Sequence, residues 1–175
     1  MTDYQEAVQN PGFCFTDAEL QSGLPVTGLW NMPEAMSGNF AVVFQIRSSG
    51  HTYAVKCFTT YHPDQEQRYA IIAEYLQQAR LPYMVGFVFL RQGIKIRGQW
   101  YPILKMEWVH GESLDSYIVR NLKDSEAIQN LANRFVDLTS ALEHYKIAHG
   151  DLQHGNILVV NGDIRLRANI KSCGN

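Results

Sequence analysis

The spacing of hydrophobic residues predicts strands in the first half of the chain and helices in the second. Two runs rich in β-branched and aromatic residues, 40–46 and 52–58, flank the turn-forming segment Ser48-Ser49-Gly50-His51, a pattern typical of a β-hairpin. Further strands are expected at Tyr83–Leu90, Gly93–Arg97 and Trp100–Val109, with turns at Gly93 and at Arg97-Gly98.

Helical spacing appears twice. Apolar residues recur near the helical period after His62-Pro63-Asp64, and Leu81-Pro82 ends this first helix. A longer helix is predicted where apolar residues alternate in steps of three and four, at Ile128, Leu131, Phe135, Leu138, Leu142 and Tyr145. The order of hairpin, helix, further strands and then helices predicts an α+β fold.

The residues before the first hairpin are punctuated by glycine and proline, which predicts an irregular lead-in over 1–34. One short helix is expected near Thr16–Ser22, capped by Thr16, with Glu19 three residues later as its capping-box partner. Two further parts should follow, a sheet-rich part over 35–109 and a helical part over 110–175.

The composition excludes several classes of protein. The 175 residues carry 15 basic and 17 acidic side chains, a formal net charge of −2, which argues against a nucleic-acid binder. Cys14, Cys57 and Cys173 lie far apart and form no metal-binding or disulfide pattern. No apolar stretch is long enough to span a bilayer, and the polar N-terminus differs from a signal peptide. We therefore expect a cytoplasmic protein without nucleic-acid or membrane partners.

The most chemically informative segment follows the long helix and reads HGDLQHGNILV from His149 to Val159. Asp151 and Asn156 stand five residues apart on a predicted loop, and the apolar residues behind them anchor that loop as a strand. Such an arrangement can place a carboxylate beside an incoming hydroxyl and an amide oxygen on a metal ion. Phosphoryl transfer requires this, because its catalysis depends mostly on positioning and charge neutralisation.

This segment resembles the catalytic loop of the protein-kinase-like superfamily, in the HGD form of small-molecule kinases and some bacterial kinase-like proteins. The resemblance extends over about 35–166, and it implies Asp151 as the catalytic base, Asn156 as a magnesium ligand, and ATP and Mg²⁺ as cofactors. Gly150 stands where many protein kinases have arginine, so control through a phosphorylated activation loop is not expected. Gln153 replaces a lysine of Ser/Thr kinases, which removes a positive charge from the phosphate site.

A second match lies upstream, in the order and at the distance that the superfamily requires. Tyr53-Ala54-Val55-Lys56 resembles the VAIK strand, whose lysine contacts the α- and β-phosphates. Alternation along a strand would point Ala54 and Lys56 to the same face, towards a nucleotide beneath the sheet. An acidic residue of the following helix should orient Lys56; Glu74 fits, and Glu66 is the other candidate.

Residues 36–43, MSGNFAVV, align with the glycine-rich pattern GxGxxGxV. Only Gly38 and Val43 remain of that pattern, since Met36 and Ala41 occupy the other two glycine positions. Backbone amides near Gly38 could still approach phosphate. A plain hairpin turn explains this segment equally well.

The segment Met106-Glu107-Trp108-Val109 resembles the hinge that links the two lobes of a kinase. By this resemblance Met106 is the gatekeeper, and backbone groups of Glu107 and Val109 bond adenine. The alternative is a buried strand end. His110 to Leu114 would then lead from the hinge into a helix.

After Asn156 the resemblance requires a second hairpin and then a magnesium-binding aspartate near position 168. Asn161-Gly162 predicts the hairpin turn, but no Asp or Glu follows Asp163, which is better explained as a turn residue. The segment 167–175 does not continue the expected helical pattern. We therefore expect a domain truncated before its activation segment, through a frameshift, an early stop or the divergence of a pseudokinase.

The resemblance implies ATP-dependent phosphoryl transfer to a protein or small-molecule hydroxyl, impaired here because the magnesium-binding aspartate is missing. The alternative is a catalytically inactive module, of the pseudokinase type, that binds a nucleotide or a partner; a third interpretation is a sheet-rich scaffold with no nucleotide site. The apolar face of the long helix would lack the later helices that cover it, so we expect that face to be exposed or covered by a second copy.

Overall fold

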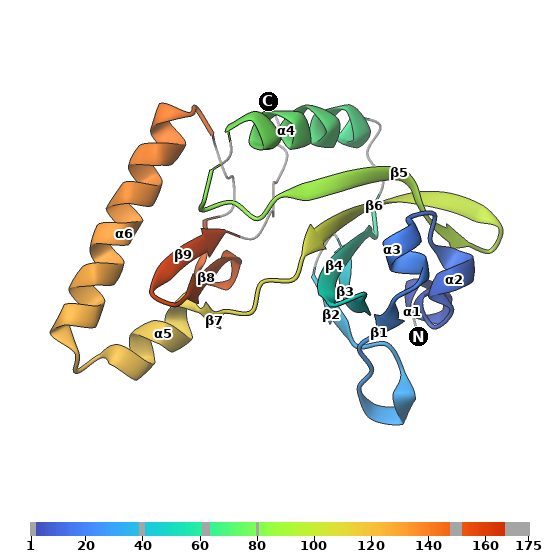
Figure 1. The fold of residues 1–175 in the computed structure, drawn as a ribbon, viewed down its shortest axis with the longest axis horizontal. Helices are drawn as coiled ribbons and strands as arrows, with labels where there is room; N and C mark the ends of the chain where they lie inside the picture. The colour runs from blue at the N-terminus through green and yellow to red at the C-terminus, as the bar shows by residue number, and fades with distance from the viewer. Residues whose placement is uncertain (1–2, 39–40, 61–63, 80, 148–151, 167–175) are drawn as a thin grey trace. The chain divides into compact units, whose positions relative to one another are not determined.

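The computed structural model describes residues 3–38, 41–60, 64–79, 81–147 and 152–166. The chain divides into two compact units (Figure 1). Unit 1 comprises Met1–Glu74 and Gly86–Trp108, and unit 2 comprises Tyr75–Val85 and Val109–Asn175. Unit 1 is rich in sheet and unit 2 in helix, which confirms the predicted α+β class.

Within the described residues, unit 1 is built on an antiparallel sheet of six strands. Its strand order is β1-β3-β4-β6-β5, and β2 also pairs with β3. The strands are β1 (Leu24–Pro25), β2 (Ala35–Ser37), β3 (Ala41–Ser48), β4 (His51–Phe58), β5 (Phe87–Ile96) and β6 (Gln99–Glu107).

Two hairpins of this sheet turn where the sequence predicted turns. Ser49 and Gly50 join β3 to β4 with φ angles of 49° and 84°, and Arg97 and Gly98 join β5 to β6 with φ angles of 48° and 86°. Two successive residues of positive φ give the backbone twist that matches paired strands. The predicted hairpins are therefore confirmed.

The prediction of separate strands over 83–90 and 93–97 is wrong. Strand β5 is continuous, with a bulge between Leu90 and Ile94. A Cβ atom on Gly93 would lie 2.2 Å from Cγ1 of Ile103, so a side chain has no room there. Gly93 thus marks a bulge and a close approach inside one strand, which a glycine in a strand pattern often does.

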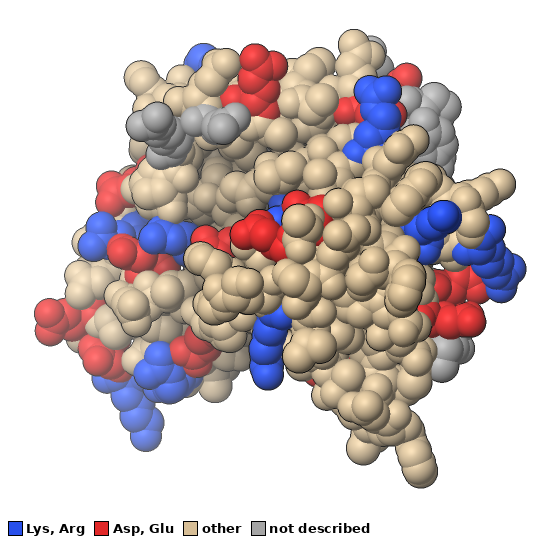
Figure 2. Space-filling view, turned by 45° about the vertical axis from the view of Figure 1, so that its right-hand side comes forward, with Lys and Arg blue, Asp and Glu red and all other residues tan. Residues whose placement is uncertain are grey.

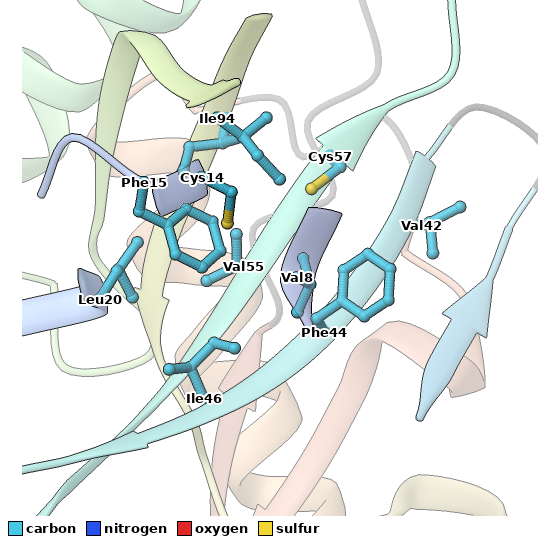
Figure 3. Packing of buried hydrophobic residues seen from close by; sticks show 11 residues of the cluster. Val8, Cys14, Phe15, Leu20, Val42, Phe44, Ile46, Val55, Cys57 and Ile94 are labelled. Carbon is cyan, nitrogen blue, oxygen red and sulfur yellow. The ribbon is translucent and has the colours of Figure 1, made fainter. Parts of the chain in front are cut away.

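One face of the sheet is covered by the N-terminal segment, which forms three short helices where the sequence predicted one. These are α1 (Asp3–Val8), α2 (Pro11–Cys14) and α3 (Ala18–Gln21). They bury apolar side chains against alternate residues of the strands (Figure 3). The buried cluster comprises Val8, Cys14, Phe15, Leu20, Val42, Phe44, Ile46, Val55, Cys57, Ile94 and Ile103.

The cap of α3 differs from the prediction. Asp17, and not Thr16, is the N-cap: the amide of Leu20 donates to Oδ1 of Asp17 at 3.0 Å. Thr16 instead donates its hydroxyl to the carbonyl of Gln92 in β5 at 2.7 Å. Glu19 is therefore no capping-box partner, and its carboxylate is available for contacts with the sheet.

The opposite face of the sheet carries helix α4 (Gln65–Ala79), whose first part belongs to unit 1. Tyr69 of this helix is buried, and its ring packs on Phe58, Phe87 and Phe89 with centroid distances of 5.3, 5.8 and 5.9 Å. Aromatic contacts of this kind stabilise a core beyond the area they bury. The sheet thus lies between two helical layers.

The loop between β1 and β2 projects from the sheet and contains the short 3₁₀ segment η1 (Leu29–Asn31). It is closed by a hydrogen bond from the amide of Gly28 to the carbonyl of Met32 at 2.9 Å. Its tip exposes Leu29 and Trp30, and the loop forms the lowest, uncharged part of the surface in Figure 2.

Besides the end of α4, unit 2 contains two helices and a small antiparallel sheet within the described residues. The helices are α5 (Leu114–Asn121) and α6 (Ser125–His144), and the sheet comprises β7 (Glu112–Ser113), β8 (Ile157–Val160) and β9 (Asp163–Leu166), with the 3₁₀ segment η2 (His154–Asn156) before β8. The β8–β9 turn at Asn161 and Gly162 has φ angles of 52° and 85°, as predicted.

Helix α6 confirms the long predicted helix, but its apolar face is not left exposed. Leu131, Leu138 and Leu142 are buried, and Phe135 is partly buried. They pack in one cluster with residues of the β8–β9 hairpin, Ile157, Val159, Ile164 and Leu166. The expectation of an uncovered helix face is therefore wrong, because the hairpin that follows in the chain supplies the covering surface. Among the described residues, no helix has the length and apolar character that crossing a membrane requires.

Candidate functional site

The strand register of unit 1 gathers four of the predicted nucleotide-binding residues on one face of the sheet. Val43 of β3 lies directly opposite Lys56 of β4, and Ala54 of β4 lies opposite Met106 of β6. Directly paired residues of antiparallel strands share a face, and residues two apart on one strand do so too. Ala54 and Met106 are buried, and Val43 and Lys56 are half-buried. This face of the sheet therefore carries one lysine and three apolar residues.

The two acidic candidates for orienting Lys56 have different surroundings. Glu66, near the start of α4, forms an ion pair with Arg91 of β5. Glu74 lies further along the same helix and belongs to the same unit as Lys56. Glu66 is thus engaged with another cation, and the pairing of Glu74 with Lys56 stays a prediction.

The segment aligned with the glycine-rich loop is a hairpin. Met36 and Ser37 of β2 pair with Val43 and Val42 of β3. The amide of Gly38 donates to the carbonyl of Ala41 at 2.9 Å, so this N–H closes the turn. The role of Gly38 in phosphate binding remains a prediction, and residues 39–40 lie outside the described residues.

The segment predicted as a hinge leaves the sheet at the end of β6. The amide of Trp108 donates to the carbonyl of Thr52 at 2.8 Å, and Glu107 is the preceding residue, paired with Tyr53. In an antiparallel ladder, hydrogen-bonded and non-hydrogen-bonded pairs alternate. The main-chain N–H and C=O of Glu107 therefore point away from β4. Val109 is half-buried and begins unit 2.

In unit 2, Asn156 ends the 3₁₀ segment η2 and is 6% exposed. The main-chain N–H of Asn156 donates to the carbonyl of Gln153 at 2.9 Å, and the apolar strand β8 follows directly. The main chain of Asn156 is thus held directly before an apolar strand, as the sequence predicted for an anchored loop, and the residue is buried. Asp151, the predicted catalytic base, lies outside the described residues.

Helix α5 begins beside η2. Nδ1 of His154 lies 3.8 Å from Oδ1 of Asp115, in the first turn of α5. A hydrogen bond from the side chain of Ser113 holds the pKa of Asp115 below its usual range, so that carboxylate is charged at neutral pH. The first turn of α5 therefore presents negative charge to the segment that contains Asn156.

The described residues do not by themselves provide a magnesium site. They contain no group of three or more His, Cys, Asp or Glu side chains that could hold a metal ion. Among the predicted ligands, only the neutral amide of Asn156 lies in the described part, whereas magnesium is usually bound through carboxylates and phosphates. Position 168 lies outside the described residues. Asp163 lies in β9, with Oδ1 3.4 Å from Nε of Arg134, as suits a residue that follows a turn.

Sequence reasoning missed a charged cluster on the face of the sheet that α1–α3 cover. Lys105 of β6 has a side chain only 8% exposed, and its Nζ lies 2.7 Å from Oδ1 of Asp17 and 2.5 Å from Oε2 of Glu19. The same ammonium lies 4.4 Å from the ring centroid of Tyr53. Burial works to lower the pKa of Lys105, but its hydrogen bonds with the two carboxylates outweigh burial and raise it. The signal in the sequence was a lysine on the inward face of an apolar strand.

The comparison with protein families agrees with this arrangement. The family model described as protein kinase domain matches residues 36–168, which is most of the chain and begins after the three N-terminal helices. A comparison with curated proteins finds no match. The matched region covers β3–β6, α4 and the segment with Asn156 in the order that the sequence motifs predicted. The chain belongs to the protein kinase domain family.

Proposed function

We propose that this chain binds ATP on the sheet face that carries Lys56, and that it is a phosphotransferase of reduced activity towards a protein or small-molecule hydroxyl. Members of the family generally use ATP and Mg²⁺. One observation carries the proposal: the register puts Val43, Ala54, Lys56 and Met106 on the same face of the sheet.

Each of these residues suits a part of the nucleotide. A lysine ammonium forms charge-assisted hydrogen bonds with phosphate oxygens, which are among the stronger polar contacts in proteins. Ala54 is small and buried, so a flat base can approach the strand, with Val43 and Met106 as apolar neighbours. The main-chain carbonyl of Glu107, which points away from β4, offers an acceptor for the edge of adenine.

The proposed chemistry follows from the catalytic-loop motif. Asp151 would accept the proton of the acceptor hydroxyl while that oxygen forms its bond to the γ-phosphorus and ADP leaves. Asn156 would contribute a neutral oxygen ligand for magnesium. The catalytic-loop resemblance calls for a magnesium-binding aspartate near position 168, where the sequence has Arg167, Ala168 and Asn169. Loss of a metal-binding carboxylate weakens the stabilisation of the transition-state charge, so the expected turnover is slow.

The missing magnesium-binding carboxylate favours a second candidate function, a module that binds ATP without transferring its phosphoryl group. With alanine at position 168, binding through Lys56 and the apolar face would persist, because those contacts do not require the metal.

The test compares Lys56→Met with Lys95→Met. Lys95 is also a strand lysine of the same sheet, but it is exposed and lies 5.5 Å from the ring centroid of Trp100. Calorimetry with a non-hydrolysable ATP analogue and Mg²⁺ should give a dissociation constant that rises about tenfold or more for Lys56→Met and is unchanged for Lys95→Met.

Phosphate release distinguishes the two candidates. Slow release of the γ-phosphate that Asp151→Asn abolishes would support the phosphotransferase, and binding without release would support the inactive module. If the wild-type chain binds no nucleotide, both candidates are refuted.

A further inference from the structure

The Lys105 cluster connects the N-terminal segment to the strand that leads into the predicted hinge. Glu19 bridges two strands: its Oε1 accepts from the hydroxyl of Tyr53 in β4 at 2.8 Å, and its Oε2 accepts from Lys105 in β6 at 2.5 Å. Lys105 directly precedes Met106. The contacts of one carboxylate therefore reach both strands at the end of the sheet where Glu107 pairs with Tyr53.

Asp17 couples the same lysine to the folding of α3. Its Oδ1 accepts both from the amide of Leu20, which caps the helix, at 3.0 Å and from Nζ of Lys105 at 2.7 Å. A buried ammonium is costly unless it is paired and hydrogen-bonded. Lys105 can therefore stay at its buried position in β6 only while α3 is formed and docked.

We propose that Lys105 is a positioning residue that, through Asp17 and Glu19, holds in place the end of β6. This end of the strand carries Met106 and Glu107. Helix α3, which lies outside the family match, thereby sets the affinity for nucleotide. The claim on affinity rests on the proposed function. Lys105 touches no nucleotide in this proposal, because it lies on the sheet face opposite Lys56: it pairs with Val55, the neighbour of Lys56 in β4.

The chain offers a matched control at the other end of the same hairpin. Asp3 of α1 lies 2.8 Å from Arg97, in the turn between β5 and β6. This pair also joins the N-terminal segment to the hairpin, but its side chains are exposed, at 49% and 78%. Removal of the Asp3–Arg97 ion pair therefore weakens another contact between the N-terminal segment and the hairpin, far along β6 from Met106.

The experiment measures peptide-resolved hydrogen exchange in the nucleotide-free full chain for wild type, Asp17→Asn/Glu19→Gln and Asp3→Asn. Asparagine is also a good N-cap, so Asp17→Asn removes charge and keeps the capping oxygen. Exchange in peptides covering 105–108 should become about tenfold faster in the double variant, as expected for loss of hydrogen bonds to a charged group. Asp3→Asn should leave these peptides unchanged.

Nucleotide affinity is measured on the same proteins, well below their unfolding midpoints. If the end of β6 is in place for only part of the time, the apparent dissociation constant rises by the inverse of that fraction. We expect about a threefold or greater rise for the double variant and none for Asp3→Asn. Should the double variant fail to fold, Glu19→Gln alone keeps Asp17 paired with Lys105, and its exchange in 105–108 should still exceed that of Asp3→Asn.

Equal exchange in 105–108 for the test and control variants would overturn the proposal, as would faster exchange there without any change in affinity. If wild type binds no nucleotide, the proposed function and the claim on affinity both fail, and the exchange comparison alone decides whether the cluster holds β6.

Discussion

Replacement of Phe15 by alanine tests most directly whether the N-terminal segment is part of the core of unit 1. Phe15 is 1% exposed, belongs to the cluster that packs on the sheet, and pairs through its backbone with Ile94 of β5 (Figure 3). Phe13 precedes it by two residues and is 87% exposed. The two phenylalanines therefore differ in burial and share their chemistry and their segment.

The magnitude follows from the burial. Truncation of a buried phenylalanine to alanine costs about 3–5 kcal/mol of unfolding free energy, because transfer energy is lost and a cavity remains. Phe13→Ala, at the surface, should change the unfolding free energy by no more than about 0.5 kcal/mol. With a urea slope of about 2 kcal/mol/M, Phe15→Ala should lower the unfolding midpoint by roughly 2 M.

Tryptophan fluorescence in urea is the suitable assay, since all three tryptophans, Trp30, Trp100 and Trp108, belong to unit 1. The signal therefore reports the unit that contains the mutation. Midpoints that agree within error for Phe13→Ala and Phe15→Ala would refute the packing of the N-terminal helices on the sheet, and with it the basis of the Lys105 proposal.

Three further predictions concern pH, thiol reactivity and a turn. Hydrogen bonding with Lys105 holds the pKa of Glu19 below its ordinary value of 4.5. The ionised carboxylate therefore stabilises the fold above about pH 4.5, and this contribution is lost as the pH falls through the lower pKa of the folded state. In urea titrations, Glu19→Gln should reduce the loss of unfolding free energy over this acidic range. Burial raises the pKa of Cys14 to about 12, and it raises the pKa of Cys57 still further above its ordinary value. At neutral pH a thiol reagent should therefore modify neither cysteine until urea unfolds the chain. Peptide mapping of the modified protein would detect this. Gly162 has a φ angle of +85°, so Gly162→Ala should lower the free energy of unfolding by about 1 kcal/mol. Hydrogen exchange in β8 and β9 should become faster. Unchanged exchange would contradict the turn geometry.

Local patterns in the sequence were sufficient for the hairpins and the long helices. Ser49-Gly50 and Asn161-Gly162 adopt the paired positive φ angles that their residue types favour, and α6 follows its apolar spacing. These features depend on neighbours within a few residues, for which turn chemistry and periodicity are direct evidence. The same patterns failed at Gly93, because a glycine in a turn and a glycine in a bulge are indistinguishable until the partner strand, with Ile103, is known.

The N-terminal helices were harder to predict for a different reason. Helices of six, four and four residues are too short to be stable alone, so their formation depends on packing against distant strands. Thr16 was a plausible cap on local grounds, but its hydroxyl bonds to β5, which lies 76 residues away in sequence at Gln92. Likewise, the burial of the α6 face was not predictable from the helix itself, because it depends on the hairpin that follows.

The candidate site was largely predictable because it depends on alternation. Once Lys56 is placed on a strand, Ala54 shares its face, and the pairing of β4 with β3 and β6 adds Val43 and Met106. The partner of Lys56 on α4 was not predictable to one residue, since the helix start and its rotation both depend on packing. Glu66 illustrates this, because its partner is Arg91 of the neighbouring strand β5.

Alternation also shows how the two faces of this sheet could be coupled, as proposed for Lys105. In β6, Leu104 and Met106 lie on the face that carries Lys56, whereas Ile103 and Lys105 face the N-terminal helices. A buried lysine between apolar neighbours would normally destabilise a strand, and here its cost is offset by two carboxylates from a segment outside the family match. The N-terminal segment therefore supplies the charges that pair the buried lysine of the strand that carries Met106. The ion pairs of Lys105 with Asp17 and Glu19 are the physical route by which α3 would influence the proposed nucleotide site on the other face.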